Sequence, residues 1–199
     1  MSIIAPEVSE NGNRKWQVIT PPAAEPLTAT QVKLFGRIDG SDEDTLIEDI
    51  IKSVREATEL YLGRSLIEQS IRLLMDYWPE TYFVELPSPP LLSITSVAVL
   101  DQAGLSTAYD SANYFVVTEG IPGLIVIKDG CTPPTNTTRY HAGIRVEYKA
   151  GYGSALNVPQ PILEAMKLWS VACYEDRAQS ATPPPSAKSL LNMFKVIKL

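Results

Sequence analysis

Apolar residues recur with helical spacing in three stretches of the chain. The strongest pattern covers residues 42–62, where one broad face is apolar and the other is charged. Its apolar positions are Leu46, Ile47, Ile50, Ile51, Val54, Ala57, Tyr61 and Leu62. Ser41 or Asp42 suits the N-cap, and Gly63 stands where a left-handed residue usually ends a helix. The pattern therefore predicts a long amphipathic helix over about 42–62.

A shorter helix is predicted just before it, over about 28–36. Thr28 followed by Gln31 has the form of a capping box, in which each residue bonds the backbone of the other. Gly36 follows the last apolar position, and glycine commonly ends helices because it tolerates left-handed backbone angles.

A third helix is predicted over about 160–177. Pro159 or Pro161 can occupy its first turn, where proline is favoured. The residues that follow have a helical apolar stripe, comprising Ile162, Ala165, Met166, Trp169, Ala172 and Cys173.

Between residues 66 and 150 the pattern changes to short apolar runs separated by turn residues. These runs predict strands over 66–76, 83–86, 94–100, 114–118, 123–127 and 144–148. No helical pattern separates them, which disfavours parallel βαβ units. We therefore predict an α+β fold: a small helical body with an inserted antiparallel β region and extended termini.

The two ends of the chain differ in composition from its middle. Residues 1–16 are polar and irregular, with Asn11, Gly12 and Asn13 as breakers, so they are predicted to form a flexible arm. Residues 17–178 are predicted to form one domain that includes the β region at 66–150. Residues 179–199 are predicted to be a Pro-rich linker followed by an apolar tail.

Charge narrows the class of partner. Hydrophobic residues make up 45% of the 199 residues and charged residues 20%, which is ordinary for a domain with a core. The net charge is −6, with a pI near 4.9. Proteins that grip DNA by its phosphates usually have a basic surface. The balance disfavours such a protein, although it permits one that surrounds DNA without holding it.

Targeting signals are not evident in the sequence. The first residues lack the basic and apolar regions of a signal peptide. No apolar run approaches the roughly 18–20 residues that a membrane span needs. The protein is therefore expected to be soluble in the cytoplasm until it is assembled, with no membrane partner.

The sequence offers little catalytic or metal-binding chemistry. His141 is the only histidine, so a catalytic triad or a His-rich metal site would have to be built around it. The two cysteines, Cys131 and Cys173, have neither CxxC nor Cys/His spacing. The glycine-bearing segment 151–154 lacks the full phosphate-binding patterns. We predict no catalytic residue, no metal ligand and no cofactor.

The C-terminal decapeptide is rich in large apolar residues and follows a Pro-rich spacer. These residues are Leu190, Leu191, Met193, Phe194, Val196, Ile197 and Leu199. Such a tail either folds back on its own domain or docks on a partner. Docking on a partner is the favoured hypothesis, because the spacer projects the tail and so short a segment cannot build a core alone. A membrane-surface anchor is less supported, since only Lys188, Lys195 and Lys198 add positive charge.

Several short segments occur together in a distinctive order. They are residues 18–28, 37–44, 61–66, 84–91, 94–97, 146–153 and 158–162. As an ordered set over about residues 17–178, they resemble the head–tail connector (neck adaptor) proteins of tailed bacteriophages. Similar proteins occur in phage-derived gene transfer agents.

The resemblance implies a structural virion protein at the neck, the head–tail junction, and not an enzyme. It implies a homo-oligomeric ring, a dodecamer in that family, placed beneath the portal and assembled in the host bacterial cytoplasm. Such an adaptor bridges the portal protein to a downstream tail or stopper protein and lets DNA pass through its lumen without specific binding. On this interpretation the apolar tail residues named above are candidates for portal binding.

Two alternatives stay open at this point. A tail-terminator or stopper protein also forms rings, but such proteins tend towards all-β barrels, whereas helices are predicted here. An enzyme with an unrecognised site would need chemistry from carboxylates such as Asp76, Glu85 or Glu147, and two of them would have to meet in a cleft.

Overall fold

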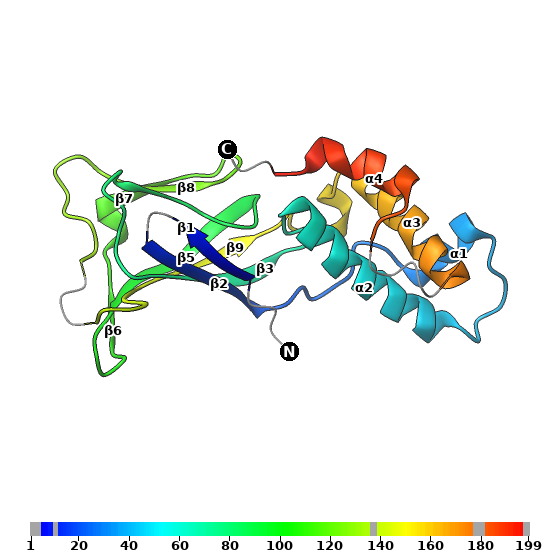
Figure 1. The fold of residues 1–199 in the computed structure, drawn as a ribbon, viewed down its shortest axis with the longest axis horizontal. Coiled ribbons are helices and arrows are strands. Elements are labelled where there is room, and N and C mark those ends of the chain that lie inside the picture. Colours follow the sequence, from blue (N-terminus) through cyan, green and yellow to red (C-terminus); the bar gives the residue numbers. More distant parts are fainter. Residues whose placement is uncertain (1–4, 10–11, 136–138, 177–181, 197–199) are drawn as a thin grey trace. The chain divides into compact units, whose positions relative to one another are not determined.

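The fold is α+β, as predicted, and its sheets are antiparallel. A computed structural model describes residues 5–9, 12–135, 139–176 and 182–196. The chain forms two compact units. The β unit lies within Met1–Pro21 and Glu68–Gly151, and the helical unit within Pro22–Ile67 and Tyr152–Leu199. Each unit is therefore assembled from segments far apart in the sequence (Figure 1).

The helical unit contains the three predicted helices and a further one near the C-terminus (Figure 1). Its elements are α1 (Ala29–Gly36), α2 (Asp44–Leu62), α3 (Gln160–Glu175) and α4 (Pro185–Leu191), with 3₁₀ turns η2 (Ala155–Asn157) and η4 (Asn192–Phe194). Helix α4 stands where the sequence predicts a linker and a tail, so this part of the chain is helical and not extended.

The start of α1 is capped as predicted, but its end has a different cause. The Thr28 backbone N–H donates to Gln31 Oε1 at 2.9 Å, and the Gln31 N–H donates to Thr28 Oγ1 at 3.3 Å. The left-handed residue after the helix is Arg37, with φ 53°, and not Gly36. A Cβ at Gly36 would lie 2.9 Å from Val171 Cγ2, so this glycine permits a close approach to α3.

Helix α2 begins slightly later than predicted and ends where predicted. Its N-cap is Glu43, which makes no side-chain capping bond, so neither Ser41 nor Asp42 caps the helix. Gly63 has φ 66° and donates its N–H to the Glu59 carbonyl, as expected of a left-handed end. The face of α2 that points into the unit carries Ile47, Ile51, Val54, Arg55, Thr58 and Leu62.

The core of the helical unit lies between α2 and α3. Trp169 is its largest fully buried side chain, with 1% of its surface exposed. The other α3 residues that are buried there match most of the predicted stripe; they are Ile162, Ala165, Met166 and Cys173. Ala187 and Leu191 of α4 belong to the same core.

The β unit contains a six-stranded and a three-stranded antiparallel sheet. The strands are β1 (Ala5–Ser9), β2 (Gly12–Thr20), β3 (Gln69–Met75), β4 (Phe83–Glu85), β5 (Leu91–Leu100), β6 (Ser106–Ala108), β7 (Tyr114–Val117), β8 (Leu124–Ile127) and β9 (Ile144–Ala150). The larger sheet has the order β1-β2-β3-β9-β5-β6 and the smaller one β4-β8-β7. Residues 5–9 and 12–20 form a hairpin where the sequence predicts a flexible arm up to residue 16.

The core of the β unit follows strand alternation. In β3, Ile71, Leu73 and Met75 are buried, and the residues between them are partly exposed. Strand β9 alternates in the same way, and its register places Val146 opposite Leu73. Residues from both sheets share one apolar cluster, so the two sheets pack against each other inside this unit.

Candidate functional site

The C-terminal segment, the candidate partner-binding site, is folded onto the helical unit. Helix α4 packs on α3, and Ala187 and Leu191 are fully buried. Proline is tolerated at the first helical position because its missing N–H has no intrahelical partner there, which allows α4 to begin at Pro185. For residues 185–196 the structure therefore shows the fold-back alternative.

The residues after α4 bind the C-terminal end of α2. The Val196 N–H donates to the Leu62 carbonyl at 2.9 Å, which satisfies one of the acceptors that a helix leaves open at its end. Tyr61 Oη donates to Asn192 Oδ1 at 2.6 Å, and Lys195 Nζ lies 4.8 Å from the centroid of the Tyr61 ring. Arg64 Nε donates to the Phe194 carbonyl. This segment is thus part of the helical unit.

The predicted portal-binding residues fall into three groups. Leu191 is fully buried, so it is not available to a partner in this conformation, because it fills the core beneath α4. Leu190, Phe194 and Val196 are partly exposed, and Met193 has 64% of its surface exposed. Ile197 and Leu199 lie outside the described residues. Portal binding by the exposed members stays a prediction.

A buried arginine ties the entry segment of the helical unit to α2. Arg55 is only 4% exposed. Its Nε donates to Glu25 Oε2 at 2.7 Å, and its Nη1 donates to Glu59 Oε2 at 2.9 Å. Burial alone would lower the pKa of Arg55, but the neighbouring carboxylates, Glu59 foremost, outweigh it and raise this pKa above its usual value. The group is thus a structural ion network that was not foreseen from the sequence.

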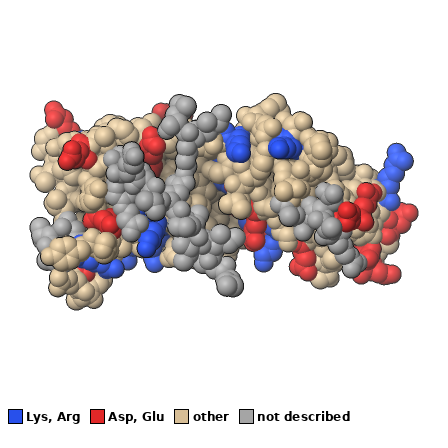
Figure 2. Space-filling view, viewed as in Figure 1, with Lys and Arg blue, Asp and Glu red and all other residues tan. Residues whose placement is uncertain are grey.

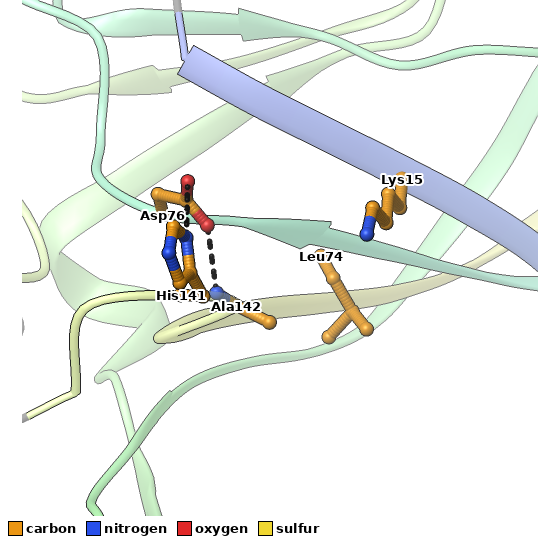
Figure 3. A pocket seen from close by; sticks show the side chains of 5 residues that line it. All are labelled: Lys15, Leu74, Asp76, His141 and Ala142. Atoms are coloured by element: carbon orange, nitrogen blue, oxygen red, sulfur yellow. Dashed lines mark hydrogen bonds and ion pairs between the residues drawn. The ribbon is translucent and has the colours of Figure 1, made fainter. Parts of the chain in front are cut away.

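A surface cavity of about 340 Å³ lies beside the only histidine, in the β unit (Figure 3). Asp76 Oδ1 accepts the Ala142 N–H at 2.8 Å, and Asp76 Oδ2 lies 3.2 Å from His141 Nδ1. Ala142 has φ 53°, a left-handed angle that its bond to Asp76 helps to hold. Lys15 and Leu74 line the cavity from β2 and β3. The Asp76 carboxylate therefore orders the 141–142 turn.

The three carboxylates that a catalytic site would have to use, Asp76, Glu85 and Glu147, either make structural contacts or are exposed. Glu147 Oε1 forms an ion pair with Arg72 Nη2 at 2.7 Å, on neighbouring strands. Asp76 holds the turn described above, and Glu85 is an exposed residue of β4. Asp76 is the only one of the three carboxylates among the residues that line the cavity beside His141, so two of them do not meet there.

The described residues also do not form a metal centre. Among them, no group of three or more His, Cys, Asp or Glu side chains is placed to hold a metal ion. Both cysteines are free, and burial raises the pKa of the Cys173 thiol, which disfavours the reactive thiolate. No helix in the described part of the chain is long and apolar enough to cross a membrane.

The family comparison matches most of the chain. The family model described as "Head completion protein" matches residues 25–182, well over half of the sequence. No curated protein matches the chain. The matched range includes helices α1, α2 and α3 and strands β3 to β9, and it ends before α4.

Solved structures with the same fold come from a gene transfer agent particle. A chain of the virion of the native particle and a chain of the neck of the empty particle, computed with C6 symmetry, each have a TM-score of 0.79. A chain of the neck of the native particle, computed with C12 symmetry, has a TM-score of 0.70. Each is 19% identical to this chain, and the match covers 92% of this chain and 96% of the other. At this identity the likeness establishes the fold.

Proposed function

The chain belongs to the head completion protein family, and from this premise we propose that it is a structural subunit of the neck that joins the head of a phage or phage-derived particle to its tail. The family match carries the proposal. It agrees with the connector resemblance found in the sequence. It is also consistent with the structural contacts of two candidate carboxylates, since Glu147 pairs with Arg72 and Asp76 accepts the Ala142 N–H.

A ring of copies is the proposed assembly. The solved necks with this fold were computed with C12 and C6 symmetry, which supports cyclic assembly and makes twelve copies the expected number. A closed ring needs two different surfaces on each subunit that meet head-to-tail. The two-unit build of this chain offers separate surfaces for that purpose.

The proposed partners are the portal protein on one side and a tail or stopper protein on the other. We assign the portal contact to the exposed surface of α4 and η4, because residues 185–196 are folded onto the helical unit and do not form a free tail. Met193 is its most exposed apolar residue, with Leu190 and Phe194 partly exposed beside it. Exposed apolar groups of this kind are favourable to bury against a partner.

Passage of the genome is proposed to require little adhesion to the ring. Each copy has a formal net charge of −6, so a ring of copies would be strongly acidic, and the proposal places part of this charge on the wall of the lumen. DNA phosphates bind proteins chiefly by displacing counterions with basic side chains, and an acidic wall does the opposite. The proposal is that DNA slides through the lumen without specific contacts.

The alternative neck roles are less well supported. Tail terminators and stoppers tend towards all-β barrels, whereas α2 and α3 form the core of a separate helical unit here. These two helices favour the adaptor role.

Electron microscopy of the purified full-length protein, alone and mixed with its portal protein, tests the proposal. We expect rings with twelvefold symmetry seated on the portal. Met193→Glu should reduce attachment to the portal, because it places a charge in the apolar contact, whereas Leu34→Glu, at a residue of α1 that is 82% exposed, is the matched control. A protein that stays monomeric in both samples would contradict the proposed function.

A further inference from the structure

Helix α2 carries a second apolar stripe on its outward face. The stripe consists of the apolar residues Leu46, Ile50, Ala57 and Leu60, with the polar Ser53 at its middle position. Their spacing of four, three, four and three residues is that of the a and d positions of a coiled coil. Leu60 is 74% exposed and Leu46 36%, while Ile50 and Ala57 are partly exposed. Ile50 and Ala57 also pack against the edge of the core, so the stripe is a partly exposed face beside the buried face of the same helix.

A hollow lies beside the stripe at Ser53, its one polar residue. Ser53 lies at a cavity of about 190 Å³ between α2 and α3. Val54 and Cys173 line it and are 2% and 6% exposed, so the hollow reaches down to the apolar core. Cavities of about 150 Å³ hold a benzene molecule. The hollow thus has the size for one large apolar side chain, as the holes of helix–helix seams do.

The exposed flank of the stripe is acidic. Asp49 and Glu56 are seven residues apart, both exposed, and both fall on the g position beside the seam. Lys52 lies within four residues of each, and Arg55 Nη2 donates to Glu56 Oε1 at 3.3 Å, so part of this charge is offset. On the face shown in Figure 2, acidic side chains gather over the end of the helical unit where α2 begins. The opposite flank, at Val54, is buried in the unit's own core.

A second copy of α2 does not complement this surface. In an antiparallel pair, the acidic flank of one helix would face the acidic flank of the other, and like charges at such positions are destabilising. In a parallel pair, that flank would have to meet the opposite flank, which the core of the unit already covers. The complement is therefore a helix with basic residues beside its apolar stripe.

We propose that the stripe on α2 binds an amphipathic helix of a different protein, whose apolar side chains cover the stripe and whose Lys or Arg residues face Asp49 and Glu56. One large side chain of that helix fills the hollow at Ser53. From Leu46 to Leu60 the stripe is about 21 Å long, the length of about four helical turns. The identification of the partner as another neck protein rests on the proposed function. The binding surface on α2 is independent of that function.

Peptide binding to the full-length protein tests the proposal. The probe is a fluorescent helical peptide of about 21 residues, three heptads, with Leu at its a and d positions and Lys at the flanking positions. Its matched control has Glu in place of each Lys. We expect the Lys peptide to bind about tenfold more tightly in fluorescence anisotropy, because only it complements Asp49 and Glu56.

Two variants locate the binding site. Ser53→Trp fills the hollow and should weaken the Lys peptide about tenfold or more. Asp49→Lys combined with Glu56→Lys should reverse the preference in favour of the Glu peptide. Leu34→Glu, on α1 and outside the stripe, is the control and should leave binding unchanged. Circular dichroism confirms that each variant is folded.

Three results would overturn the proposal. They are equal binding of the two peptides, no binding of either peptide, and binding that survives Ser53→Trp. Light scattering of the protein alone adds a fourth: an oligomer of this chain that Ser53→Trp dissociates would assign the stripe to a second copy. Rings that form without peptide binding would leave the proposed function standing and remove only this inference.

Discussion

The helical unit and the β unit hold their cores together by different means. In the helical unit, side-chain bonds join segments distant in the sequence, as Arg55 does with Glu25 and Arg64 with Phe194. In the β unit, backbone ladders join the distant segments, side-chain bonds such as that of Asp76 with Ala142 add to them, and Arg72 pairs with Glu147 across neighbouring strands. The buried polar residues of the helical unit include Arg55, Arg64, Thr58 and Ser170. In the described part of the β unit, the buried polar residue is Gln69.

This difference bears on which unit has the surface that is more selective for a binding partner. Strand register fixes which residues of the β unit face outward, and several of these charges already neutralise one another on the six-stranded sheet. The outward face of α2, by contrast, combines a partly exposed apolar stripe with acidic residues on its flank. The helical unit therefore carries the surface whose chemistry is most selective for a partner.

The largest expected effect is from removing the central side chain of the helical unit. Trp169→Ala should lower the free energy of unfolding by about 3–5 kcal/mol, because a 1%-exposed indole leaves a cavity that its neighbours cannot close. Urea unfolding followed by far-ultraviolet circular dichroism measures the loss. Trp169→Phe, which keeps most of the apolar volume, should cost clearly less. A loss of under about 1 kcal/mol for the alanine variant would show that this core repacks, unlike the close-packed interior expected here.

A smaller effect is expected from adding one methyl group to the β unit. A Cβ at Gly123 would lie 2.5 Å from Leu91 Cβ, an atom fixed close to the backbone, so Gly123→Ala should cost about 1–3 kcal/mol. Gly36→Ala is the counterpart in the helical unit. Its Cβ would meet Val171 Cγ2, the end of a side chain, at 2.9 Å, and alanine is the better helix former.

Thermal or urea unfolding of both glycine variants tests this contrast. We expect Gly36→Ala to be nearly neutral and Gly123→Ala to be destabilised. Equal losses in the two variants would mean that the two units tolerate added volume alike, which would remove one part of the comparison.

The helices were predictable from local signals, because the capping residues act within a few positions of each other. Thr28 with Gln31, and Gly63 at the end of α2, mark their boundaries in the sequence and have those roles in the structure. Helix α4 was not predicted. A run of prolines before it was interpreted as an extended linker, although proline at a first helical position, as at Pro185, is compatible with a helix.

The N-terminal hairpin was also missed, for a related reason. The segment 11–13 was interpreted as a set of breakers, yet Gly12 is the first residue of β2 and pairs with Ser9 of β1. The hairpin joins the larger sheet through the pairing of β2 with β3, which is far along the chain, and a local sequence pattern does not indicate that pairing.

The candidate site could be predicted only in its composition. The apolar residues of the C-terminal segment are plain in the sequence, but which of them are covered depends on the packing of α4 against α3. Leu191 is buried and Met193 is exposed although both are large, apolar and two positions apart. The stripe on α2 was contained in the predicted apolar face, and only the structure separates its outward members from its buried ones.

The smallest expected effect concerns the buried phenol of the β unit. Burial raises the pKa of Tyr148 well above its ordinary value, and its Oη donates to the Pro87 carbonyl at 2.7 Å. Below about pH 10 the phenol is protonated in both the folded and the unfolded chain. Above that pH the unfolded chain loses the proton first, so stability falls as pH rises, by up to about 1.4 kcal/mol per pH unit. The folded-state pKa is the raised one, so this contribution is present at neutral pH and is lost in alkali.

Tyr148→Phe should therefore have two opposite consequences. At neutral pH it should cost about 1 kcal/mol, because the Pro87 carbonyl loses its hydrogen-bond donor. Between about pH 10 and 11 the loss of stability with pH should be shallower than in the unmodified protein, because one titrating group has been removed. Urea unfolding at several pH values measures both, with Tyr140→Phe, at a residue that is 89% exposed, as the matched control. An unchanged alkaline slope would show that the interior of the β unit admits the phenolate, and its contrast with the helical unit, whose interior holds the charged Arg55, would then fail.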